Sequence, residues 1–200
     1  MAERALISVQ AAGRAAIRPD LARVHLGCMV EHDRAAEAFE GCSSATAAVI
    51  AALRKAGLGE GAISTSGIQL TRRHDNQRYL GTNNLAVTVR PPERTGEILG
   101  IAVGAGADAL SINNLEFGVA DDTEARSRAR AEAVRDAYAI ANELAGAAGV
   151  TLGRLVSLDE GGGFRPHRES QRMAPMAAAA PVEIGDQEVV VSVAAVFEIA

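Results

Sequence analysis

The chain has 200 residues, of which 48% are hydrophobic and 22% charged, and its net charge is −5 at pH 7. A chain of this length forms one domain, or two very small ones, and buries enough surface to fold without disulfides or a metal. The negative charge argues against a general nucleic-acid-binding protein, and aromatic residues (3%) are too few for base-stacking surfaces.

Cysteine content and segment hydrophobicity bear on the compartment. Cys28 and Cys42 are the two cysteines, too few for a disulfide framework, and we expect both to be buried free thiols. No run of about eighteen apolar residues occurs, so no membrane-spanning segment is predicted. The start, MAERALISVQ, lacks the regions of a signal peptide. The sequence as it stands therefore predicts a cytoplasmic protein; the alternative is a periplasmic or secreted protein whose leader has been removed.

Two strands are predicted at the start of the chain. Residues 5–10 have strand character, and Gly13 is interpreted as a turn. A second strand then alternates cleanly to about Val30. Pro19 and Asp20 interrupt the beginning of this second strand, which indicates an edge strand or a bulge.

A helix and a hairpin follow. Asp33 is expected to cap a helix over residues 34–56, whose apolar residues recur every three or four positions. Strands at 63–72 and 85–90 then form a hairpin. The connection between them, from residue 73 to about 83, is polar and basic.

The remaining chain predicts two helices and three strands. Pro91–Pro92 suits the entry of a short helix. The later elements, each recognised from its periodicity, lie at residues 109–119, 121–149, 154–159 and 189–199. The last strand is apolar on both faces, so it is expected to be central in its sheet or covered by another layer or subunit.

The resulting element order is ββαββαβαββ. Strands outnumber helices and come in adjacent pairs, which predicts an α+β fold with helices packed on an antiparallel or mixed sheet. Residues 161–186 contain three consecutive glycines and several prolines without periodicity, which is typical of a flexible loop. We predict a single domain over 1–200 that contains this loop.

The helix over 121–149 has unusually clear ends and a ladder of small residues. Asp121 or Asp122, with Glu124, is typical of a helix start, and Gly149 of a helix end. The alanines that repeat every four residues are Ala125, Ala129, Ala133, Ala137, Ala141 and Ala145. Such a ridge allows close approach of another element, either a sheet or a second subunit.

Candidate chemistry is weak throughout. His25 and Cys28 point to opposite sides of a strand, so with His32 they do not complete a metal site. Residues 104–109 resemble a dinucleotide fingerprint, but a helix precedes them and a strand follows, which reverses the required order. No nucleophile motif or isolated carboxylate pair occurs. We therefore expect no catalytic residues, no cofactor and no metal, and interpret the protein as a non-enzyme.

Two basic loops are the candidate contacts with a partner. Arg72, Arg73 and Arg78 lie in or beside the hairpin connection, and Arg165 and Arg168 lie in the long loop. Clustered positive charge suits an acidic partner or anionic headgroups. The alternative is ordinary solvated loop charge, since exposed charges contribute little.

Eight stretches form a pattern that covers nearly the whole chain in a constant order. They are residues 7–9 with 19–22, residues 48–57 with 63–65, 85–89, 106–108, 115–117, 125–126 with the alanine ladder, 149–153, and 188–197. The pattern resembles the SIMPL-domain family, which includes bacterial periplasmic and surface-immunogenic proteins. The resemblance implies an α+β domain, homo-oligomers in some members, and links to oxidative stress. It implies no established catalytic residues.

The leading hypothesis is a non-enzymatic, self-associating SIMPL-type domain that serves as an assembly or interaction module linked to the stress response. Its expected partner is a second copy of the chain, and nucleic acid is not expected. The alternative is a small-molecule or peptide-binding domain that uses the loops at 73–83 and 161–186.

Overall fold

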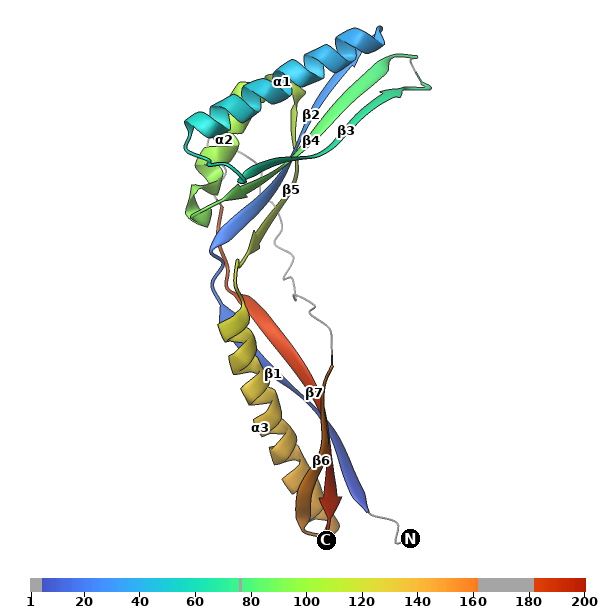
Figure 1. Cartoon of the computed structure of the whole chain (residues 1–200), viewed down its shortest axis with the longest axis vertical. Helices are drawn as coiled ribbons and strands as arrows, with labels where there is room; N and C mark the ends of the chain where they lie inside the picture. The colour runs from blue at the N-terminus through green and yellow to red at the C-terminus, as the bar shows by residue number, and fades with distance from the viewer. Residues whose placement is uncertain (1–4, 76, 162–181) are drawn as a thin grey trace. The chain divides into compact units, whose positions relative to one another are not determined.

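The computed structural model describes residues 5–75, 77–161 and 182–200, in which the chain forms two compact units (Figure 1). The terminal unit contains β1 (Leu6–Ile17), α3 (Thr123–Ala148), β6 (Leu152–Gly161) and β7 (Gln187–Ile199). The central unit contains β2 (Leu21–His32), α1 (Ala35–Lys55), β3 (Ile63–Arg72), β4 (Tyr79–Val89), α2 (Thr95–Gly106) and β5 (Leu110–Gly118).

The α+β class and the order ββαββαβαββ are confirmed. The strands, however, divide between two antiparallel sheets, ordered β1-β7-β6 and β3-β4-β2-β5. The single domain over 1–200 stays a prediction. The predicted loop at 161–186 falls mainly on residues 162–181, outside the described residues.

In the terminal unit, β7 lies between β1 and β6, and the pairing with β1 is continuous from Leu6↔Glu198 to Ile17↔Gln187. Alternate β7 residues from Val189 to Phe197 are at most 4% exposed and pack with the alanines of α3. The intervening residues are partly exposed or exposed on the opposite face. β7 is therefore central in its sheet, as one of the predicted alternatives had it, and buries one of its two apolar faces.

The alanine ridge of α3 packs on the sheet of its own unit. All six alanines are at most 2% exposed, and the five from Ala125 to Ala141 cluster with residues of β1 and β7. The prediction of a turn at Gly13 is wrong, because Gly13 lies within β1. A Cβ there would stand 2.0 Å from the Ala129 carbonyl oxygen and 2.3 Å from the Ala133 nitrogen. Glycine is needed at this position because the backbones of β1 and α3 nearly touch.

The ends of α3 follow local chemistry. Asp121 accepts a hydrogen bond from the Thr123 amide at 2.9 Å, while the N-cap residue Asp122 makes no capping bond with its side chain. Gly149 adopts the left-handed conformation (φ 71°), and the amide of Val150 donates to the Ala145 carbonyl at 3.0 Å. This geometry satisfies a carbonyl that the helix end would otherwise leave unpaired.

In the central unit, α1 and α2 pack on one face of the sheet. β2 lies between β4 and β5, so it is not an edge strand; its pairing with β5 shifts register between His25 and Leu26. Cys28 and Cys42 are buried free thiols, as predicted, and the Cys42 thiol donates to the Cys28 carbonyl at 3.2 Å. Among the helices that the structure describes, none has the length and hydrophobicity to cross a membrane.

Candidate functional site

The hairpin connection that carries Arg73 and Arg78 is shorter than the sequence predicted. β4 begins at Tyr79, and Tyr79 pairs directly with Arg72. The predicted loop at 73–83 is therefore wrong for residues 79–83, which belong to the strand. These residues include a glycine, a threonine and an asparagine, and their strand conformation comes from pairing with β2 and β3 rather than from their own propensity.

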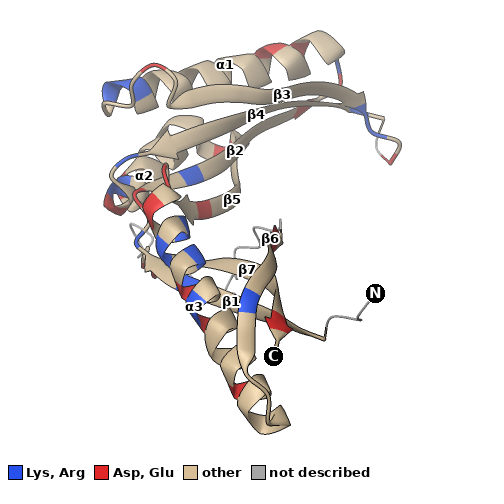
Figure 2. Cartoon of the chain, turned by 60° about the horizontal axis from the view of Figure 1, so that its bottom comes forward, with Lys and Arg blue, Asp and Glu red and all other residues tan. Residues whose placement is uncertain are grey.

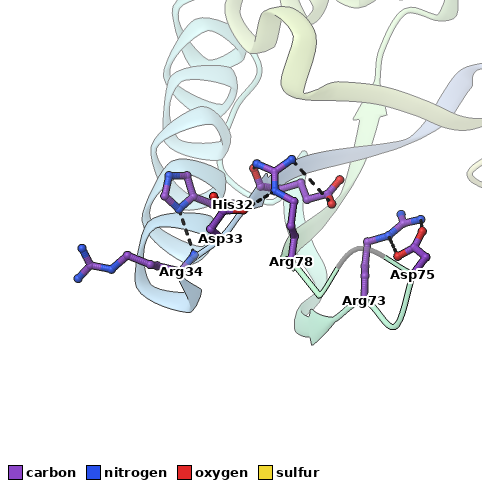
Figure 3. Close-up of polar contacts among 7 residues, drawn as sticks. His32, Asp33, Arg34, Arg73, Asp75 and Arg78 are labelled. Atoms are coloured by element: carbon purple, nitrogen blue, oxygen red, sulfur yellow. Dashed lines mark hydrogen bonds and ion pairs between the residues drawn. The ribbon is translucent and has the colours of Figure 1, made fainter.

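Two of the candidate arginines make ion pairs inside the hairpin and its base (Figure 3). Arg73 binds Asp75 through two hydrogen bonds, of 3.1 and 2.6 Å. Arg78 donates to Asp33 at 2.8 Å, and its Nη1 stands 4.0 Å from a Glu31 carboxylate oxygen. Acidic neighbours thus offset both positive charges.

The pairing of Asp33 with Arg78 also changes the start of α1. Asp33 was expected to cap this helix, but the N-cap residue is Arg34, which makes no capping bond with its side chain. The Arg34 amide donates instead to His32 Nδ1 at 3.2 Å (Figure 3). The carboxylate of Asp33 therefore binds Arg78 of the hairpin connection rather than the first turn of α1.

Arg72 differs from the other two arginines. Its Nε donates to the Gln77 carbonyl at 3.4 Å, and its guanidinium lies 5.8 Å from the centre of the Tyr79 ring. Arg165 and Arg168 lie outside the described residues. Contact between these arginines and a partner stays a prediction, as does a ligand pocket formed by the two loops.

The edge of β3 is the feature that sequence reasoning missed. Among the strands that the structure describes, β3 pairs with β4 alone, so none of them lies at its other edge. Ile68 and Leu70 pair with Asn83 and Gly81, and Gly81 lies against the backbone of α1, so both side chains are on the helix side of the sheet. They are nevertheless 56% and 44% exposed. Their alternation predicted a strand, but nothing in the sequence showed that the strand is an edge.

Other edges carry features that oppose pairing with a further strand. Side chains of α3 bind the backbone of β1 at Arg14 and Ala16, so a further strand pairs there only if it displaces them. β6 has two register shifts and carries Asp159 and Glu160, and β5 has one shift and carries Glu116. β3 has one shift, at its start, and no charged residue before its last position. Figure 2 shows β3 without charge until the hairpin.

A metal or catalytic cluster was also sought. Among residues 5–75, 77–161 and 182–200, no group of three or more His, Cys, Asp or Glu side chains could hold a metal ion. Cys28 is fully buried, whereas His25 is partly exposed on the opposite face of β2. The expectation of a non-enzyme remains an expectation.

Comparison with known proteins identifies a family for almost the whole chain. The family model SIMPL, described as a protein of unknown function (DUF541), matches residues 7–197. The chain therefore belongs to the SIMPL family.

Two relatives share the description "26 kDa periplasmic immunogenic protein", one from Brucella melitensis biotype 1 and one from Brucella abortus strain S19. Each is 30% identical to this chain over 218 aligned positions, which cover 98% of this chain and 85% of the relative. Their description fits the periplasmic alternative and does not support the cytoplasmic expectation.

Proposed function

We propose that this protein is a self-associating assembly module whose copies pair through the free edges of β3. The observation that carries the proposal is the uncharged edge with exposed Ile68 and Leu70. A two-fold axis at Gln69 pairs the two strands antiparallel and places Ile68 of one copy opposite Leu70 of the other. Such a contact is self-complementary, as a two-fold dimer requires.

The expected affinity is modest. The four side chains would remove on the order of 300 Å² from water, or about 7 kcal/mol at ~25 cal/mol per Å². That gain is comparable to the association cost of about 4–15 kcal/mol, so backbone hydrogen bonds between the two strands decide the outcome. We expect dissociation constants in the micromolar range, and larger assemblies only if a second surface contributes.

Light scattering after size exclusion tests the proposal at tens of micromolar protein. The wild-type chain is expected to be larger than a monomer, and Ile68→Lys is expected to be monomeric, because it places a charge on the paired face. Val103→Lys is the matched control, since Val103 is a 43% exposed side chain on α2. A monomeric wild type refutes self-association; an Ile68→Lys variant that stays associated refutes only the role of β3.

The compartment and the physiological role extend this proposal. The periplasmic description of both relatives supports a periplasmic location for this chain. The link to the stress response rests on the family resemblance alone. Fractionation of cells that express the protein from its natural gene would test the location directly.

A further inference from the structure

The outer edge of β1 borders an open hollow in the terminal unit. The hollow has a volume of about 460 Å³ and is lined by Arg14, Ala15, Ala16, Arg128, Ala131, Glu132 and Arg135. β1 pairs with β7 alone among residues 5–75, 77–161 and 182–200, so no described strand lies beside its other backbone edge. The hollow therefore combines an unpaired strand edge with charged side chains of α3.

Two hydrogen bonds show what this edge binds. The backbone amide of Arg14 donates to the Glu132 carboxylate at 2.6 Å. Arg128 donates to the backbone carbonyl of Ala16 at 3.2 Å. An added strand would bring a carbonyl acceptor to the Arg14 amide and an amide donor to the Ala16 carbonyl. The side chains of α3 therefore make the hydrogen bonds that the backbone of an added strand could make. The carboxylate of Glu132 already shows that an anionic group fits beside the edge.

Positive charge predominates around the hollow. Of the described residues that line it, three are arginines and Glu132 alone is acidic. Arg14 makes a 3.4 Å ion pair with Glu188. Within the described part of the chain, neither Arg128 nor Arg135 pairs with a carboxylate. Figure 2 shows the basic residues in the first half of α3, interspersed with acidic ones. A ligand that complements this lining carries negative charge.

We propose that the β1 edge binds an extended acidic peptide segment, which adds as a strand beside β1 and displaces Glu132. Alternate side chains of an added strand point to the same face. Those on the α3 side would meet Arg128 and Arg135, so glutamate or aspartate suits them. The peptide backbone would accept a hydrogen bond from the Arg14 amide and donate one to the Ala16 carbonyl. This site is distinct from the β3 edge and does not depend on self-association.

Fluorescence anisotropy with the full chain tests the proposal. The probe is a labelled eight-residue peptide that alternates valine and glutamate; the matched probe alternates valine and lysine. We expect the acidic probe to bind and the basic probe not to bind. Arg128→Glu and Arg135→Glu should each weaken binding roughly tenfold, because each loses a charge-assisted contact. Glu132→Gln should strengthen binding, because it weakens the internal competitor.

Controls separate strand addition from simple charge attraction. Arg54→Glu makes the same charge reversal at an exposed position of α1, which does not line the hollow. This variant should therefore leave binding unchanged. An acidic probe with prolines at the pairing positions retains its charge but loses backbone donors. Equal binding of this probe overturns strand addition, and unchanged binding to Arg128→Glu and Arg135→Glu overturns the site. Displacement of the probe by equimolar glutarate or inorganic phosphate would identify a small-anion site and overturn the peptide assignment.

Discussion

Substitution of Gly13 by alanine tests the close packing of β1 against α3. The new Cβ would stand 2.0 Å from the Ala129 carbonyl oxygen, about 1.4 Å short of an ordinary contact distance of 3.4 Å. Neither neighbour can yield alone, because both atoms in the clash belong to the helix backbone. The helix and the sheet must therefore separate along the alanine ridge.

The loss in the free energy of unfolding depends on how many packing contacts between α3 and the sheet are weakened. A gap of about 0.5–1 Å already forfeits a quarter to a half of the dispersion attraction between facing atoms. Overpacking of a core ordinarily costs about 1–3 kcal/mol, and six buried alanines share this interface, so we expect the upper end of that range. A loss of ~3 kcal/mol lowers the melting temperature by roughly 6–12 °C for a chain of this size.

Urea and thermal unfolding, followed by far-UV circular dichroism, measure the effect. Gly146→Ala is the matched control: Gly146 lies in α3, and no neighbouring atom lies within 4 Å of its added Cβ. Alanine there should stabilise the chain by about 0.5–1 kcal/mol, because it is the better helix former. A Gly13→Ala variant as stable as the wild type would refute the reasoning that Gly13 sets the spacing of β1 and α3.

Two further predictions concern titratable groups. Paired hydrogen bonds from Arg130, at 2.6 and 3.0 Å, lower the pKa of Glu160. The Glu160 carboxylate therefore binds a proton more readily in the unfolded chain than in the folded one. The stabilisation by this ion pair is complete above the unfolded pKa of about 4.3 and is lost as the pH falls through the lower folded pKa. Arg130→Ala should accordingly be less stable than wild type at neutral pH and converge with it in acid; a constant difference down to low pH would contradict this. Burial is the larger cause that raises the pKa of the Cys42 thiol, and the neighbouring Cys28 is the second. Both cysteines are buried free thiols, so iodoacetamide should label neither of them until the chain unfolds. Rapid labelling under native conditions would show that the central core opens.

Local patterns in the sequence were sufficient for the class of fold and for most element ends. The order ββαββαβαββ follows from periodicity, because a side chain repeats its direction every two residues on a strand and about every 3.6 on a helix. Gly149 ends α3 as its residue type indicated, since the left-handed conformation there has a local cause. The alanine ridge likewise indicated close packing before any partner was visible.

Tertiary structure alone decided which elements meet. Glycine is required at position 13 by the backbone of α3, which lies more than a hundred residues later in the chain. The local sequence carries no sign of this contact, so it predicts a turn instead. The same holds for Asp33, whose carboxylate binds Arg78 instead of the adjacent helix end.

The two candidate surfaces depend on strand neighbours in the same way. Ile68 and Leu70 are exposed because β3 is an edge, and the hollow beside β1 joins Arg14 to Arg128 and Arg135 across a gap of more than a hundred residues. A sequence records which face of a strand each residue occupies, because that depends on alternation. Which edge of the strand stays open depends on the pairing of distant segments, and that is settled only when the whole chain has folded.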